Sequence, residues 1–519
     1  MRLLIVSLLA GSIAMPAYAK KAKPAEEEQG PPKVSVFVQC DGAKGHADGF
    51  ELFGQLVAIT FTAGLSEAAM GHPKVTDRLD GRPGAEACEA AVAQEGNLVR
   101  RTQLSFARTI HYLEAEDLDA ALESARKSAG IVDANREDWA YLQSMGASAY
   151  FLEAYVLAKM GRVEEAEAVA YRSGMMAPYD LLAMLRVSGF LGLTSQLTPE
   201  KTAYLDQFVR LFPHALKYRA ELFAENRDYV RAAADLLAFR RAWHAFKPDD
   251  RQPSFSAQRA VYLIMAGDRA ASLEVVEEAQ SELDKLRADG DAANSMAVIT
   301  LAEELLRFQA IVDKFQAGQK DEAAELLMTG GNWTAVNSAV VADLLEQIQR
   351  DLPEADRKGI LKDAPDALRK MRLADNLANL TQTKGIEKLY DRVAAVAQRS
   401  AYTSNASAVW KAGDDPKFLL ERQPKEDRIY EVVGMYPRYV GLAAGEALIL
   451  HCALIARHRG SAGFVLFPSR NRLDIAGVQF IDSADQEFPR SAMFDPETVI
   501  GALSQHIPEP ERVSRKNKR

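Results

Sequence analysis

Apolar residues recur at helical spacing through almost the whole stretch from Arg100 to Arg399, and this periodicity constrains the fold more than any other feature. The stretch is rich in Ala, Leu, Glu and Arg, and glycines and prolines interrupt it at intervals. Helices that are interrupted repeatedly must pack against one another to bury their apolar faces. We therefore expect a mainly α-helical protein in which residues 100–400 form a series of packed helical hairpins.

Residues 147–178 contain the clearest of these hairpins. Ala154 and Ala166 are small residues placed where two antiparallel helices would approach each other. Gly161 lies between them and lets the chain reverse, and Pro178 can end the second helix. With Leu157 as the large apolar residue, this order resembles a tetratricopeptide repeat. The resemblance implies a helical solenoid, an architecture that commonly binds other proteins.

Weaker copies of this hairpin surround it, and a small residue marks the second helix of each. The steps between these residues range from 40 to 66 positions, whereas a regular array would repeat after about 34. We expect an irregular helical-hairpin solenoid with extra helices inserted near 180–198; the alternative is an ordinary irregular helical domain. The marker residues are Ala121, Ala166, Ala232, Ser272 and Ala323.

The beginning of the chain has the features of an exported protein. Arg2 precedes a short apolar run, and Ala17-Tyr18-Ala19 has the form of a cleavage site, so residues 1–19 are predicted to be a signal peptide. Residues 20–33 are rich in Pro, Glu and Lys and are predicted to be a disordered linker. We expect a periplasmic or secreted protein that is not membrane-spanning, because no later stretch approaches the ~18 apolar residues of a spanning helix.

Residues 34–99 are predicted to form a short mixed cap in front of the helical array. The segment "KVSVFVQC" alternates polar and apolar residues and favours a short strand. Cys40 and Cys88 both lie in this cap, and an oxidising compartment would permit a disulfide between them. Such a bond would contribute roughly 4 kcal/mol in the chain-entropy model.

The period changes again in residues 410–507, which predict a small α/β module in the order β-α-β-β-α. Strands are expected at 428–436, in "GFVLF" and in "LDIAGVQFI", with a turn at 468–471 and a final helix opened by Asp495 and Pro496. The segment "EALILHCALIARHRGSAGFVLF" resembles a small uncharacterised family of α-proteobacterial lipoproteins, which implies an envelope location and no chemistry. Residues 508–519 form a basic tail that could contact an anionic surface weakly.

The sequence contains no recognisable motif for a metalloprotease, a phosphate-binding loop or a nucleophile elbow. His451 and His458 could share one helix face beside Cys452, but an apolar core position and a basic last turn explain them more simply. Cys40 and His46 could hold a metal only if Cys40 were not in a disulfide. The net charge of −9 argues against nucleic acid as a partner. We therefore expect no cofactor, no metal and no enzymatic activity.

The expected function follows from the array. First helices of successive hairpins would line a concave face, and such faces bind segments of other proteins. We expect an exported scaffold or adaptor that binds another envelope or secreted protein; the alternatives are a module for envelope polysaccharide or peptidoglycan, and an enzyme with its site in the C-terminal module. Aromatic residues at inward positions would either line this groove or pack against the next repeat. The predicted groove residues are Phe151, Tyr155, Lys159, Lys217 and Glu221, with Ser148, Ala158, His214, Ala224 and Glu225 at the flanking inward positions.

Overall fold

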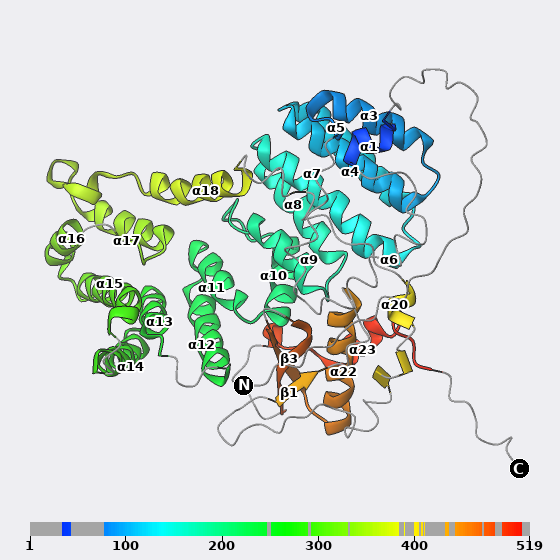
Figure 1. Cartoon of the computed structure of the whole chain (residues 1–519). Helices are drawn as coiled ribbons and strands as arrows, with labels where there is room; N and C mark the ends of the chain where they lie inside the picture. Colours follow the sequence, from blue (N-terminus) through cyan, green and yellow to red (C-terminus); the bar gives the residue numbers. More distant parts are fainter. Residues whose placement is uncertain are drawn as a thin grey trace, which may run out of the picture.

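The protein is mainly α-helical, and its helices pack on one another largely in the order of the chain (Figure 1). The computed structural model describes residues 34–42, 77–246, 251–288, 292–330, 333–382, 389, 399–403, 406–407, 409–410, 431–434, 442–469, 472–482 and 490–510. The predicted signal peptide and linker, and the end of the basic tail, lie outside these residues.

The helices of the described residues have the following bounds: α1 Val36–Asp41, α3 Gly81–Gln94, α4 Leu98–Glu114, α5 Leu118–Asp133, α6 Trp139–Tyr141, the π-helix η1 Leu142–Gly146, α7 Ala147–Lys159, α8 Val163–Met175, α9 Leu181–Val187, η2 Ser188–Phe190, α10 Pro199–Leu211, α11 Ala215–Glu225, α12 Tyr229–Phe246, α13 Pro253–Met265, α14 Arg269–Ala288, α15 Ala292–Gln316, α16 Lys320–Thr329, α17 Ser338–Asp351, η3 Glu354–Asp356, η4 Gly359–Lys362, α18 Pro365–Thr381, α20 Arg399–Thr403, α22 Leu442–Arg459, η7 Arg490–Ala492 and α23 Pro496–Leu503. The strands are β1 Glu431–Gly434, β2 Gly463–Ser469 and β3 Arg472–Ile481.

Five helix pairs turn through the same backbone geometry. The pairs are α4–α5, α7–α8, α11–α12, α13–α14 and α15–α16, and in each the residue that follows the first helix by one or two positions has a positive φ. The next N–H donates to the carbonyl oxygen five residues earlier, for example from Arg162 to Leu157 at 2.9 Å. This is the Schellman pattern, which closes a helix and reverses the chain. The positive-φ residues are Glu116, Gly161, Arg227, Gly267 and Gly318.

The marker residue of each second helix lies five positions after this turn, and all five are fully buried. A small side chain is needed there because the second helix approaches its partner closely at that point. Ser272 shows how tight the contact is, since its hydroxyl donates to the carbonyl oxygen of Ala260 at 2.8 Å across the hairpin. The predicted hairpin positions are therefore confirmed.

The irregular spacing has a structural cause between the second and third hairpins. Helices α9 and η2 are inserted there, within the range 180–198 expected for extra helices, and α10 follows at 199–211. The array is divided into two hydrophobic cores at about this point. One core extends from α4 to α12 and includes the C-terminal helices and strands, and the other holds α11–α17. Figure 1 shows the two groups of helices side by side, with α18 reaching from one to the other.

The N-terminal cap is helical where a strand was expected. Residues 36–41 form helix α1, and Ser35 caps it by accepting a hydrogen bond from the N–H of Val38. A short apolar segment fits either structure by its pattern alone, and here contact with α3 and α4 decides for the helix.

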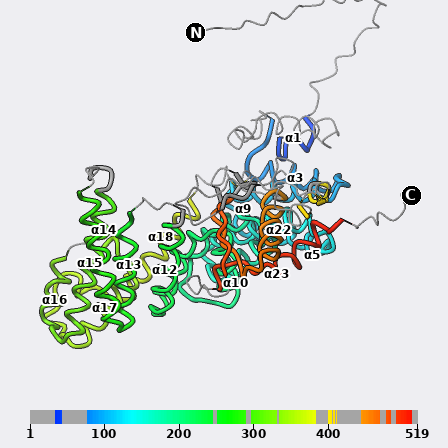
Figure 2. The backbone as a smooth tube through the Cα atoms, turned by 90° about the horizontal axis from the view of Figure 1, so that it is seen from below, coloured from blue at the N-terminus to red at the C-terminus, as the bar shows by residue number. Residues whose placement is uncertain are grey.

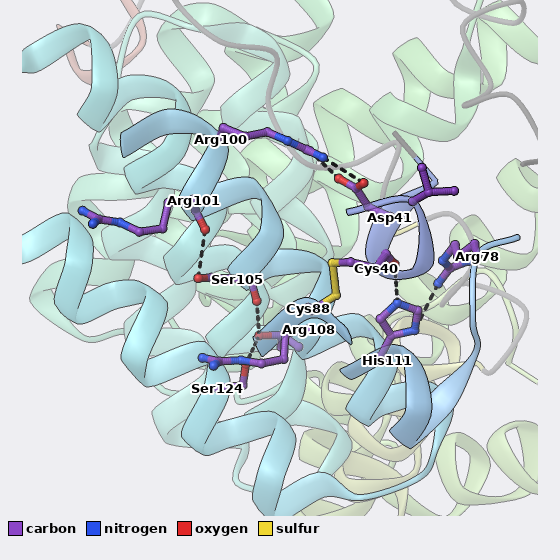
Figure 3. Close-up of a disulfide and its surroundings, with 12 residues drawn as sticks. Cys40, Asp41, Arg78, Cys88, Arg100, Arg101, Ser105, Arg108, His111 and Ser124 are labelled. Carbon is purple, nitrogen blue, oxygen red and sulfur yellow. Dashed lines mark hydrogen bonds and ion pairs between the residues drawn. A yellow bond between two sulfur atoms is a disulfide. The ribbon is translucent and has the colours of Figure 1, made fainter. Parts of the chain in front are cut away.

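Cys40 and Cys88 form the expected disulfide, which joins α1 to α3 (Figure 3). Arg100 of α4 binds both carboxylate oxygens of Asp41, and His111 of α4 donates to the carbonyl oxygen of Cys40 at 2.6 Å. The disulfide is consistent with an oxidising compartment outside the cytoplasm.

The C-terminal module has the expected order β-α-β-β-α, and its sheet is antiparallel with strand order β1-β3-β2. Phe464 of β2 lies opposite Phe480 of β3. The turn expected at 468–471 does not begin at Pro468, because β2 continues through Ser469, and residues 470 and 471 lie outside the described residues. Gly460 ends α22 with a positive φ, as expected. Figure 2 shows this module beside α9 and α10, at the opposite end of the molecule from α14–α17.

Candidate functional site

Four acidic side chains from two helices lie on the face along which α18 runs. Glu221 and Glu225 are one turn apart on α11, and Asp343 and Glu346 are three residues apart on α17. The two helices are in contact, and Asn337 at the start of α17 donates to Glu225 at 3.3 Å. We call these four residues the acidic strip.

Helix α18 occupies the acidic strip with two arginines that are one turn apart. Arg369 binds Asp343 and lies 3.0 Å from Glu346 of α17. Arg372 binds Glu225 and lies 2.9 Å from Glu221 of α11. One turn of a helix therefore neutralises acids from two helices that are more than 100 residues apart in the sequence.

The other half of α18 extends over the first group of helices. Asn376 donates to the carbonyl oxygen of Gly192 at 3.0 Å, and a Cβ atom added to Gly192 would lie 2.3 Å from the Asn376 amide nitrogen. Leu377 and Leu380 pack partly buried against the first core, and α18 contacts α7. Figure 1 shows α18 as the yellow-green helix between the two groups.

The turn before α12 binds the same strip from the other side. Arg227, which has a φ of 59°, lies 3.1 Å from Asp343 and 2.6 Å from Glu346. Tyr229 donates to the second carboxylate oxygen of Asp343 at 2.5 Å. Asp343 would therefore keep two partners if α18 moved away.

The opposite end of the strip depends more strongly on α18. The side chain of Glu225 is 5% exposed, and burial raises the pKa of its carboxyl while Arg372 opposes that effect. A buried carboxylate that loses its cation is strongly destabilising. The Glu225 end therefore requires a positive charge in the position of Arg372.

A second buried charge pair lies close to this end. Lys201 of α10 is fully buried and binds Glu167 of α8 at 3.0 Å and the carbonyl oxygen of Thr194 at 2.7 Å. Burial lowers the pKa of Lys201, and Glu167 opposes the shift. Burial raises the pKa of Glu167, and Lys201 opposes that shift in turn. The pair is enclosed, so it belongs to the supporting structure and not to the surface.

The predicted groove residues on α7 are not on a surface. Phe151 and Tyr155 are 0% and 1% exposed, and Ser148 and Ala158 are buried with them. Phe151 packs edge-on against Phe190 of η2 at 6.1 Å. The expectation that these residues line an open groove is corrected, because α7 is covered by α4, α5, α8 and α18. The nearly continuous apolar sequence of α7 is typical of a fully enclosed helix.

The predicted residues on α11 are divided between two places. Glu221 and Glu225 lie together in the acidic strip, whereas Ala224 is buried. Lys217 instead lies 5.7 Å from the ring of Phe255, and His214 stacks on Phe212 at 4.9 Å.

Asp343, Glu346, Arg369 and Arg372 are not among the residues predicted from the sequence. The segment "ALRKMRLADNL" could have indicated a basic amphipathic helix, because Arg369, Arg372 and Asn376 recur at helical spacing. Lys159, the remaining predicted groove residue, is half-buried at the end of α7.

A polar cluster joins the C-terminal module to the array. Gln143 on the π-helix η1 donates to the buried Glu446 of α22 at 2.9 Å and accepts from Tyr402 at 3.1 Å. His506 stacks on Trp139 at 4.1 Å and lies 3.8 Å from Glu446. Burial raises the pKa of Glu446, and His506 and Gln143 oppose the shift.

Of the residues considered for metal binding in the C-terminal module, His451 and Cys452 lie inside the core, whereas His458 is exposed in the last turn of α22. His451 is 1% exposed, and burial lowers its pKa to about 4, so the ring is neutral at pH 7. Cys452 is fully buried, and burial raises the pKa of its thiol. Within the described ranges, no group of three or more His, Cys, Asp or Glu side chains could hold a metal ion.

Nor does any helix of the described residues have the length and apolar character needed to cross a membrane. No protein-family model, no curated protein and no solved structure matches this chain. The resemblances to tetratricopeptide repeats and to the lipoprotein family therefore stay predictions.

Proposed function

We propose that the protein is an exported, non-catalytic scaffold that binds another envelope or secreted protein. Under this proposal the binding face is the one that carries the acidic strip, and its ligand is a helical segment. The observation that carries the proposal is the way in which this face already holds a helix, since Arg369 and Arg372 of α18 bind four acids from α11 and α17.

The repeated hairpin geometry supports the same proposal. Five hairpins share one turn and one buried small residue, which is the arrangement expected of a degenerate relative of tetratricopeptide repeats. Arrays of this kind present first helices side by side, and proteins use that surface to bind segments of their partners. An export destination in the periplasm or outside the cell agrees with the disulfide at Cys40.

Photo-cross-linking in intact cells tests the proposal. Tyr218 is 54% exposed and lies three and seven residues before Glu221 and Glu225 on α11, so it shares their side of the helix. A photoreactive amino acid at Tyr218 is expected to capture one dominant envelope or secreted protein. The same amino acid at Met296, which is 55% exposed on α15, is the control and is expected not to capture it.

The outcomes separate the classes of function. A single protein captured at Tyr218 and absent at Met296 supports the scaffold. Capture of glycan without protein contradicts it and favours the polysaccharide-binding alternative. Equal capture at both positions contradicts a defined binding face.

A further inference from the structure

Helix α18 is attached to the array by charged contacts and by an apolar edge that is only partly buried. None of residues 365–381 is buried, whereas every other helix of ten or more residues whose side chains are fully described has buried residues. Its outward face carries Lys370 and Met371, and Met371 is 55% exposed. Its contacts are the two arginines, the amide of Asn376 and three leucines that are only partly buried. Leu368 packs against the second core, and Leu377 and Leu380 pack against the first.

The acidic strip, by contrast, requires an occupant. Glu225 is nearly fully buried, and Glu221 lies beside it with a side chain that is 21% exposed. Removing Arg372 would leave these two carboxylates close together without their cation, which is strongly unfavourable in a buried setting. The Glu225 end of the strip is therefore stable when a basic helix covers it and unstable when it is uncovered.

A loosely packed helix on a face that requires a basic helix has the properties of an exchangeable ligand. We propose that α18 is a built-in occupant of the acidic strip, and that the partner presents a basic amphipathic helix that replaces it. This inference rests on the proposed function and specifies the chemistry of the partner. The replacing helix carries two arginines three residues apart, followed one to three turns later by a small polar residue and leucines.

In this arrangement α18 also regulates binding of the partner, because both compete for the acidic strip. A tethered segment competes at an effective concentration in the millimolar range, so only a partner that binds more tightly than α18 would displace it. Charge dominates the contact, and exchange should therefore be faster at high salt, where the Debye length falls to about 3 Å at 1 M.

The first experiment uses a fluorescent synthetic peptide of residues 365–381 and the full-length protein. The wild type is expected to bind this peptide weakly, because its own α18 competes. The variant Arg369→Ala/Arg372→Ala is expected to bind it about tenfold more tightly, because its own helix no longer holds the strip. Adding Glu221→Gln and Glu225→Gln to that variant should abolish the gain.

The matched control changes the outward face of the same helix. Lys370→Ala/Met371→Ala is expected to leave peptide binding at the wild-type level, since neither residue contacts the strip through any described contact. Equal peptide binding by the wild type, the arginine variant and this control would overturn the proposal.

Hydrogen exchange on the wild-type protein provides a test that requires no variant to fold. The amides of α18 are expected to exchange faster than those of the enclosed helix α7, and about tenfold faster again at 1 M salt. Protection of α18 equal to that of α7 and independent of salt would show that α18 is a fixed structural element, and would refute exchange.

Cross-linking in the variant background distinguishes this inference from the proposed function. If a partner is captured at Tyr218 and Arg369→Ala/Arg372→Ala increases its yield, both stand. If the partner is captured at an unchanged yield, the scaffold stands and exchange of α18 is refuted.

Discussion

The five equivalent turns can be tested at Gly161, where the backbone and not the packing sets the cost of a side chain. Gly161 has a φ of 73°, and a Cβ atom added there would meet nothing within 4 Å. Gly161→Ala should therefore cause no clash, and its whole effect should come from placing an L-residue in the left-handed region. That cost is about 1 kcal/mol.

Gly130 is the matched control, because it differs from Gly161 in backbone conformation alone. It is exposed in the last turns of α5, has no positive φ, and also has nothing within 4 Å of an added Cβ atom. Gly130→Ala should stabilise the protein by about 0.5–1 kcal/mol, because alanine loses less conformational freedom in a helix. The same chemical change should therefore have opposite signs at the two positions.

Local hydrogen exchange is the appropriate assay, because a chain with two cores need not unfold in one step. A loss of about 1 kcal/mol should speed the exchange of amides in α7 and α8 about fivefold. Gly267→Ala and Gly318→Ala should act similarly on their own hairpins, since both glycines have a φ of 85° and open space around the added atom. A Gly161→Ala protein that is as stable as Gly130→Ala would refute the turn geometry and the equivalence of the hairpins.

Three further predictions concern the N-terminal cap, the buried pair Lys201–Glu167 and the N-cap residue of α9. Cys40→Ser/Cys88→Ser should destabilise the cap by about 4 kcal/mol, because the disulfide closes a separation of 48 residues. It should also remove hydrogen-exchange protection from α1, because six residues are too few for an independent helix. Protection of α1 equal to that in the wild type would contradict this prediction. Lys201→Met should lower the free energy of unfolding by about 3 kcal/mol, because it leaves Glu167 buried without its cation. The double variant Lys201→Met/Glu167→Gln should recover part of this loss. Chemical denaturation measures the free energy of unfolding of both variants. Burial raises the pKa of Asp180 to about 6 against the effect of Arg186, so the wild type should lose stability as the pH rises from about 4 to 6. Asp180→Asn should lose about 3 kcal/mol less over that range while still capping α9. Parallel dependence of the melting temperature on pH in the two proteins would contradict this prediction.

The hairpins could be predicted from the sequence because their determinants are local. A glycine that ends a helix and a small residue five positions later define the turn without reference to the rest of the fold. The first and third hairpins lack the glycine, but Ala121 and Ala232 still identified them. The C-terminal order β-α-β-β-α was accessible for the same reason, because each segment shows its own period and its own end signals.

The environment of each helix could not be predicted in the same way. Phe151 and Tyr155 occupy inward positions of a first helix and are buried, and their helix α7 is contacted by α18, which is more than 200 residues away in sequence. The pairing of Arg372 with Glu225 joins residues 147 positions apart, and no local pattern specifies such a partner. Glu221 and Glu225 stood at predicted inward positions of α11, but no local pattern indicated that α17 supplies the other two acids or that a basic helix binds all four.

Arg227 combines a local feature, the left-handed turn of its hairpin, with a long-range contact to α17. It stands in a left-handed turn where glycine serves in three of the other four hairpins, at a conformational cost of about 1 kcal/mol. Its guanidinium contacts Asp343 and Glu346 of α17, the same two acids that bind Arg369. Glycine would relax the turn but would remove a cation that, among the described residues, these acids keep when α18 leaves. The arginine at this turn therefore keeps the Asp343 end of the acidic strip neutralised when α18 exchanges, whereas the Glu225 end depends on the incoming helix.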